Sequence, residues 1–182
     1  KLIAISDIEG NFNGFESFLK SNKIIDKDYN WIYGEGHLVL VGDFVDRGEN
    51  VTQVLWLIYK LEKQAKLNNG KVHFILGNHE IMNFQGNWRY NNRKYCKASQ
   101  EISGLNDWDK ATQFMYSNNT ELGKWLRTKN VIEKIGDYIF VHAGLSPEIL
   151  DYSLSLSQIN RITRESWDNI LYNNPKDNNV AN

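Results

Sequence analysis

The sequence predicts an α/β fold, because apolar runs of strand length alternate with segments of helical periodicity. Three short aliphatic runs are each followed by a polar, glycine-containing turn. Apolar residues at helical spacing follow the first two of these turns. This alternation is typical of strands that pair in parallel and are joined by crossover helices.

The first two strand–helix units occupy the N-terminal third of the chain. Residues 2–5 form an apolar run that we interpret as a buried strand, and residues 12–19 repeat apolar side chains at helical spacing. Residues 38–41 form the second strand. The helix after it has a strong amphipathic pattern and stops at an Asn-Gly pair; its apolar positions are Val51, Val54, Leu55, Ile58 and Leu61.

The rest of the chain predicts a third strand, a helical insertion and a hairpin. Residues 72–76 are apolar and end at a polar turn. We expect residues 81–128 to be a helical cap inserted into the domain, with helices at 107–116 and 120–127. Residues 131–141 predict a β-hairpin whose strands are joined by a tight Gly-Asp turn.

Composition bounds the class of protein. The 182 residues include 21 Lys plus Arg against 22 Asp plus Glu, for a net charge of −1, so there is no basic footprint for nucleic acid. Cys96 is the single cysteine, which excludes an intrachain disulfide framework. No apolar run approaches the length needed to cross a bilayer, and we expect no membrane insertion.

We expect residues 1–182 to form a single domain that is shortened at both ends. Lys1 already lies within the first strand, and the chain does not begin with Met. The sequence therefore does not decide between a cytoplasmic and a bacterial periplasmic location.

Chemically reactive side chains gather where the predicted strands end. In open α/β sheets, ligands bind outside the carboxyl ends of the strands. A single polar residue there is usually a solvated turn, but four strand ends carrying ligand-type residues predict a site on one rim. These residues are Asp7 and Glu9, then Asp43, Asp46 and Arg47, then Asn78 and His79, and finally His142.

The side-chain types at this rim indicate a divalent metal centre. The carboxylates offer hard oxygen donors, Asn78 offers an amide oxygen and His142 an imidazole nitrogen. Mixed oxygen and nitrogen donors suit Mn²⁺, Fe, Zn²⁺ or Mg²⁺ better than a soft metal. A carboxylate such as Asp43 can bridge two ions about 3.5–4 Å apart, as in two-metal hydrolysis.

Three motifs in order then carry a resemblance to a known family. The strings Gly42-Asp-Phe-Val-Asp-Arg-Gly48, Gly77-Asn-His-Glu80 and His142-Ala-Gly-Leu-Ser-Pro147 resemble signatures of the calcineurin-like metallophosphoesterases. Within that family the chain is most similar to the phosphoprotein phosphatases of the bacterial Shewanella-like group. The longer string from Gly77 to Asn83 and the later Trp88-Arg-Tyr90 also resemble that branch.

The resemblance implies a four-layer α/β/β/α sandwich with two divalent metal ions between its sheets. Asp7 and Glu9 would bind the first ion, Asp43 would bridge, and Asn78 and His142 would bind the second. A hydroxide bridging the ions would attack phosphorus. His79 would act as general acid, Asp46 would orient it, and Arg47 would clamp the phosphate, with Asn78 and the cap residue Arg89 also near the substrate.

One position departs from the family pattern. The first family motif is Asp-x-His, whereas this chain has Asp7-Ile-Glu9. Glu9 replaces a neutral donor with an anion, which shifts the expected metal toward hard ions, Mn²⁺ first and Mg²⁺ next, with Fe or Zn²⁺ as alternatives. The other interpretation is a degraded first metal site.

A second departure is a missing ligand. The family supplies a further His to the second metal from a segment downstream of the His142 motif, and no His follows His142 here. His37 and His73 lie at or inside apolar runs, so we expect structural roles for them. The expected explanation is that a C-terminal part of the domain is missing from the chain.

These observations predict a metal-dependent phosphoesterase that acts on phosphomonoesters. A phosphorylated protein is the first substrate expected, on Ser/Thr or Tyr, and a small phosphoester is the other. One alternative is a dinucleoside polyphosphate hydrolase. A second alternative, from a different class, is a catalytically idle module that binds phosphate-bearing partners.

Overall fold

The structure, a computed structural model, describes residues 1–167. The chain begins with β1 (Leu2–Ile5), α1 (Phe12–Ser21), β2 (His37–Val41), α2 (Val51–Leu67) and β3 (Lys71–Ile75). The three strands form one parallel sheet in the order β1-β2-β3. This confirms the predicted α/β class, and the predicted strand boundaries agree to within one residue.

Helices dominate the segment after β3. They are α3 (Asn78–Phe84), α4 (Arg93–Ser103), α5 (Trp108–Met115) and α6 (Glu121–Leu126). The sequence predicted α5 and α6, whereas α3 and α4 were missed. The hydrophobic residues of α4 are few, so its helical pattern is hidden among polar residues. The helices agree with a helical insertion, and its status as a cap stays a prediction.

A hairpin and two further helices complete the described part. The strands β4 (Ile132–Ile135) and β5 (Tyr138–Val141) pair antiparallel, as predicted. The helices α7 (Glu148–Asp151) and α8 (Leu156–Ser166) follow. The α8 residue Asn160 fixes the hairpin, because its side-chain oxygen accepts hydrogen bonds from the N–H groups of Val131 and Ile132 at 2.9 and 3.2 Å.

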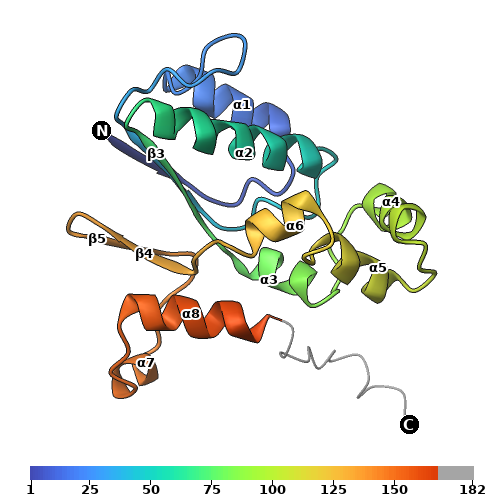
Figure 1. Cartoon of the computed structure of the whole chain (residues 1–182). Coiled ribbons are helices and arrows are strands. Elements are labelled where there is room, and N and C mark those ends of the chain that lie inside the picture. The colour runs from blue at the N-terminus through green and yellow to red at the C-terminus, as the bar shows by residue number, and fades with distance from the viewer. Residues whose placement is uncertain (168–182) are drawn as a thin grey trace.

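The elements are arranged in layers. Figure 1 shows α1 and α2 on one side of the parallel sheet, and the β4–β5 hairpin with α8 on the other side. The core between the sheet and the first two helices is closely packed and aromatic at its centre, where Phe15 contacts Phe44 edge-to-face at 5.7 Å. Its fully buried members include Phe15, Leu19, Leu38, Leu40, Phe44, Ile58 and Leu61.

This packing places the loops that carry chemistry. The loops after β1 and β2 are joined by backbone hydrogen bonds from Asp7 N to Gly42 O at 3.0 Å and from Glu9 N to Asp43 O at 2.9 Å.

No helix in residues 1–167 is long and apolar enough to cross a bilayer.

Candidate metal-dependent active site

The ends of four strands meet at one rim, as the sequence predicted, although the fourth strand belongs to the hairpin and not to the parallel sheet. The hairpin is anchored to the rim by His142, whose Nδ1 donates to the backbone oxygen of Val41 at 2.7 Å. This contact needs Gly42, because a Cβ atom at that position would lie 2.5 Å from His142 Nδ1. The tertiary packing of the hairpin therefore brings the fourth strand end to the site.

Two groups of side chains at this rim could each hold a metal ion. Ligand atoms of Asp7, Asp43 and His142 all lie within 4.8 Å of one another, and so do those of Glu9, Asp43 and His79. Asp43 belongs to both groups, which agrees with the bridging position expected for it. The resemblance pairs Asp7 with Glu9, whereas the structure groups Asp7 with His142.

Asp43 is held in a fixed orientation. It is 4% exposed, and its Oδ1 accepts a hydrogen bond from the backbone N–H of His79 at 3.0 Å. Its Oδ2 lies 3.1 Å from His142 Nε2. Gly77 makes this approach possible, because a Cβ atom there would collide with Asp43 Oδ1. One carboxylate oxygen is thus fixed by the backbone, and the other faces the imidazoles.

His142 presents its Nε2 to the site. Because Nδ1 donates to Val41 O, Nε2 is the nitrogen left to act as acceptor or ligand, and it lies 3.1 Å from Asn78 Oδ1. Partial burial acts to lower the pKa of His142, but the hydrogen bond to Val41 and the negative charge of Asp43 and Asp7 outweigh it and raise that pKa. The negative groups around His142 therefore favour a cation beside its Nε2.

His79 and Asp46 form a buried pair beside these groups. His79 Nδ1 lies 2.6 Å from Asp46 Oδ2, and Asn83 Nδ2 donates to the other Asp46 oxygen at 2.8 Å. Asn91 extends this chain of hydrogen bonds by donating to Asn83 Oδ1 at 2.8 Å. Burial raises the pKa of Asp46, although the hydrogen bonds from Asn83 and His79 oppose it. Asp46 thereby fixes the ring of His79 and directs its Nε2 toward Asp43, at 3.9 Å.

Glu80 supports the loop that carries Asp43. Its carboxylate is fully buried and accepts hydrogen bonds from the N–H groups of Asp43, Phe44 and Gly77 at 2.9, 2.8 and 2.8 Å. Burial raises the pKa of Glu80, and these three donors oppose it. The loop after β2 and the start of α3 are thus joined through one side chain, a role that sequence reasoning missed although Glu80 belongs to the Gly77-Asn-His-Glu80 motif.

Arg47 lies at the exposed side of the site. Its guanidinium contacts the carboxylate of Glu9, and its backbone N–H donates to Tyr90 O at 2.8 Å. The contact with Glu9 raises the pKa of Arg47. The Tyr90 ring packs on His79 with centroids 5.0 Å apart, and Arg89 lies over the same ring at 5.6 Å. Sequence reasoning gave Tyr90 no role, although it lies in the Trp88-Arg-Tyr90 string.

The backbone of the site is strained. Several non-glycine residues of the rim adopt positive φ angles from 47° to 71°, namely Asp7, Glu9, Asp43, Asp46 and Arg47. Each such conformation costs about 1–3 kcal/mol and persists where the surrounding structure enforces it, most often at functional sites. The strain therefore supports a functional assignment for this rim on grounds independent of side-chain chemistry.

The donor set fits a divalent cation. Asp7 and Asp43 supply carboxylate oxygens, Asn78 an amide oxygen and His142 a nitrogen whose partner nitrogen is already hydrogen-bonded to the backbone. Oxygen with imidazole nitrogen is a suitable set for Mn²⁺, Fe, Zn²⁺ or Mg²⁺. Negative charge is concentrated where cations would offset it.

The remaining histidines of the chain lie away from this rim. His37 and His73 lie on β2 and β3, where their rings contact each other at 2.8 Å between nitrogens, and His73 Nδ1 contacts Glu133 at 2.6 Å. These two histidines therefore serve the packing of the strands within the described residues, as expected.

Comparison with known proteins agrees with this geometry. Residues 1–181 match the family described as calcineurin-like phosphoesterase. The chain therefore belongs to the calcineurin-like phosphoesterase family, which confirms the resemblance read from the three motifs. Family membership implies divalent metal ions, and the donor groups at the rim are placed to hold them.

Two similar proteins are Shewanella-like protein phosphatases. Over 93% of this chain, the sequence is 33% identical to Shewanella-like protein phosphatase 1 of Plasmodium berghei. Over the same share of this chain, it is 29% identical to Shewanella-like protein phosphatase 2 of Arabidopsis thaliana. It spans 45% and 52% of these relatives, which is about half their length. Because relatives include eukaryotic proteins, the resemblance does not assign a bacterial source.

A solved structure supports the fold directly. A cold-active protein-tyrosine phosphatase of a psychrophilic Shewanella species is 40% identical and superposes with a TM-score of 0.85, over 92% of this chain and 49% of that one. A second group of relatives is more distant: the symmetrical bis(5'-nucleosyl)-tetraphosphatase of Wigglesworthia glossinidia brevipalpis is 32% identical over 79% of this chain and 44% of its own.

Proposed function

We propose that this chain provides the catalytic rim of a metal-dependent phosphoprotein phosphatase. The observation that carries the proposal is the buried His79–Asp46 pair beside the Asp7–Asp43–His142 group. A proton donor next to a cation-binding cluster is the arrangement that phosphomonoester hydrolysis requires. The relatives named protein phosphatases support a phosphoprotein as substrate.

The metal ions would be held by residues that follow four strands, β1, β2, β3 and β5. Asp7, Asp43, Asn78 and His142 would be ligands, and Glu9 would add a further carboxylate. When bound, two divalent cations supply an activated water and neutralise charge on the phosphate. Because Glu9 is anionic where the family pattern has a neutral imidazole, we propose Mn²⁺ as the preferred ion over Zn²⁺.

Metal preference can be measured without reference to turnover. Calorimetric titration of metal-free protein measures the affinity for each ion. The affinity for Mn²⁺ or Mg²⁺ relative to that for Zn²⁺ should be higher for the wild type than for the Glu9→His variant. Glu35→His, at an exposed residue in the turn before β2, is the matched control. A variant Glu9→His with an unchanged order of metal affinities would refute the role given to Glu9.

The protein side chains have separate tasks in the proposed reaction. His79 donates a proton from Nε2 to the leaving oxygen, and Asp46 holds the ring in the orientation that exposes this nitrogen. Arg47 binds phosphate oxygens with its planar fork of donors, which requires it to leave Glu9. Asn78 and Arg89 would contribute further polar contacts to the substrate.

Replacement of His79 by asparagine tests the proposal. Loss of a general acid should lower turnover by roughly 10²–10⁴-fold on a phosphopeptide. Peptides carrying phosphotyrosine should be assayed first, since the 40% identical structure is a protein-tyrosine phosphatase. Phosphoserine peptides test the other assignment. Unchanged turnover of His79→Asn, or full activity in metal-free protein, would refute the mechanism.

Hydrolysis of dinucleoside polyphosphates is the second candidate, supported by the similarity to bis(5'-nucleosyl)-tetraphosphatases. Competition between diadenosine tetraphosphate and a phosphopeptide in one assay separates the two. If both ligands bind but neither is hydrolysed with any divalent ion, the result supports the interpretation as a catalytically idle phosphate-binding module. The contact of Glu9 with Arg47 would then be part of the reason for the missing activity.

A further inference from the structure

The outer edge of β3 carries backbone groups that no strand satisfies. On the inner edge, Lys71 N donates to Gly36 O at 3.1 Å, next to β2. On the outer edge, Leu76 N donates to Asn130 O at 2.8 Å. Backbone groups alternate along a strand, so Val72 and Phe74 direct their N–H groups to the same outer edge as Leu76. Within residues 1–167, nothing pairs with this edge before the bridge at Asn130.

Unpaired backbone donors at buried positions favour a partner. Val72 and Phe74 are 6% and 2% exposed, so their main chain is largely withdrawn from bulk water. An N–H group left without a partner in such surroundings costs about 1–3 kcal/mol, whereas an added strand satisfies it. The free length corresponds to roughly three residues of an extended chain, at about 3.3 Å per residue.

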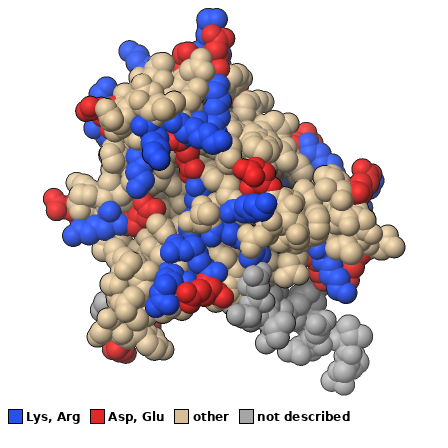
Figure 2. Space-filling view, in the orientation of Figure 1, with Lys and Arg blue, Asp and Glu red and all other residues tan. Residues whose placement is uncertain are grey.

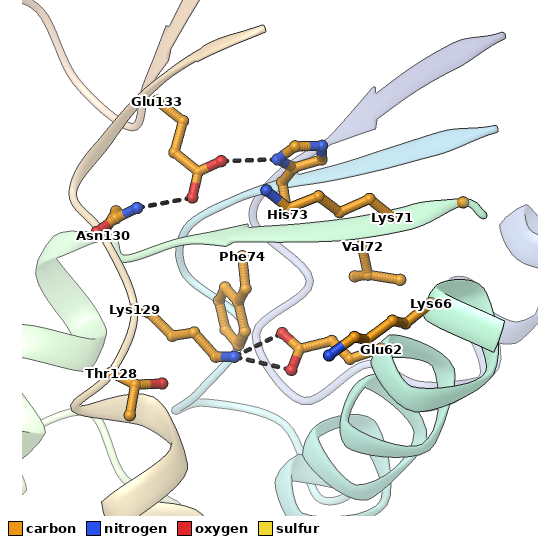
Figure 3. A pocket seen from close by; sticks show the side chains of 11 residues that line it. Glu62, Lys66, Lys71, Val72, His73, Phe74, Thr128, Lys129, Asn130 and Glu133 are labelled. Atoms are coloured by element: carbon orange, nitrogen blue, oxygen red, sulfur yellow. Dashed lines mark hydrogen bonds and ion pairs between the residues drawn. The ribbon is translucent and has the colours of Figure 1, made fainter. Parts of the chain in front are cut away.

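A pocket runs along this edge and gives a strand room to lie. Its volume is about 430 Å³, and it is bounded by the C-terminal half of α2 on one side and by residues 128–133 on the other. Figure 3 shows Glu62 and Lys66 on one side of β3, and His73 with Glu133 on the other. A second pocket continues past Lys71 and Asn130 toward α8 and adds Lys134 and Arg164.

The charges of the pocket select an acidic partner. Glu62 is paired with Lys129 at 2.6 Å, and Glu133 is held by His73 and by Asn130 at 2.6 and 2.9 Å. Glu62 is thus neutralised by Lys129, and both oxygens of Glu133 already have partners. Lys66 and Lys71 are exposed and form no ion pair within the described part of the chain. Figure 2 shows basic side chains in the middle of this face, with acidic ones among them.

We propose that the outer edge of β3 binds an extended acidic segment of a partner protein as an additional β-strand. Backbone hydrogen bonds to Val72 and Phe74 would provide the affinity, and acidic side chains facing Lys66 and Lys71 the specificity. The pocket lies beside the N-terminal half of β3, whereas the catalytic rim lies beyond its C-terminal end. The site is therefore separate from the one that would act on phosphate.

A short peptide of about five residues with consecutive glutamates at its centre is the probe, because consecutive residues of a strand face opposite sides of the sheet and so reach both Lys66 and Lys71. Fluorescence anisotropy with the labelled peptide should give saturable binding. The same peptide with N-methylated backbone amides keeps its charge but cannot pair as a strand, and should bind at least about tenfold more weakly. The double variant Lys66→Glu with Lys71→Glu should weaken binding about tenfold as well, since it places like charges opposite the peptide.

Controls separate strand addition from general attraction and from misfolding. Lys63→Glu makes a similar change on the exposed surface of α2, at a residue that does not line the pocket, and should leave binding within about twofold. Hydrolysis of an aryl phosphate by the double variant should be unchanged and reports its folding. In NMR spectra, the amide signals of Val72 and Phe74 should shift on binding.

Three results would overturn the proposal. They are absence of saturable binding up to about 1 mM peptide, equal affinity for the N-methylated peptide, and equal effects of the α2 control and the double variant. The comparison of the two peptides uses the unmodified protein, so it remains decisive even if a variant fails to fold.

Discussion

Replacing Asp46 with asparagine tests whether a buried carboxylate controls the proton donor. Asp46 is fully buried and lies 2.6 Å from His79 Nδ1. Two opposite charges with centres about 4 Å apart interact by ~4 kcal/mol at an effective dielectric constant of about 20. Asp43, at 3.9 Å from Nε2, still stabilises the protonated ring in the variant. We therefore expect turnover to fall by about 10–10²-fold, or ~1.4–2.7 kcal/mol.

The effect should depend on the leaving group. Serine alkoxide is far more basic than an aryl oxide, so it depends more on a proton from His79. The assay compares turnover of a phosphoserine peptide and of a chromogenic aryl phosphate, for wild type and Asp46→Asn. A larger loss on the phosphoserine peptide is the expected pattern, provided that the protein hydrolyses both.

Stability should change less than turnover. His79 and Asn83 contact different oxygens of Asp46, so asparagine has an oxygen for only one of them, and one unsatisfied group costs about 1–3 kcal/mol. Burial raises the pKa of Asp46, so its ionised form opposes folding at neutral pH, and the neutral amide removes that cost. Thermal unfolding should thus stay cooperative. Asp137→Asn, in the exposed turn of the hairpin, is the control. Turnover of Asp46→Asn within about twofold of wild type would refute the reasoning.

Three further predictions concern stability and metal. Gly77→Ala should lower the free energy of unfolding by at least about 2 kcal/mol in a denaturant titration, because the added Cβ atom collides with Asp43; an unchanged midpoint would contradict this. Burial opposes ionisation of Glu133, but hydrogen bonds from His73 and Asn130 lower its pKa overall. The stabilisation is therefore present at pH 7 and is lost as the pH falls below the usual pKa of a glutamate, so Glu133→Gln should cost more stability at pH 7 than at pH 4; equal costs would refute it. A chelator should lower the melting temperature of metal-loaded protein, and Mn²⁺ should restore it; no shift would count against a bound metal.

Much of the fold follows from local sequence patterns. The aliphatic runs and the periodicity of residues 51–67 define β1, β2, β3 and α2, because buried strands and amphipathic helices need those side chains whatever their neighbours. The helix α4 could not be predicted in this way. It is mostly polar and exposed, so its position depends on packing against α5.

The candidate site, like the fold, depends partly on local sequence and partly on tertiary contacts. The sequence by itself determined which residues carry chemistry, since carboxylates, an amide and imidazoles follow successive strands in motifs of a known family. Only the tertiary structure decided their grouping. The hairpin brings His142 to Asp43 from another sheet, Glu80 joins two loops through three hydrogen bonds, and Glu9 contacts Arg47. These contacts join segments far apart in the chain, and a local pattern holds no information on such distances.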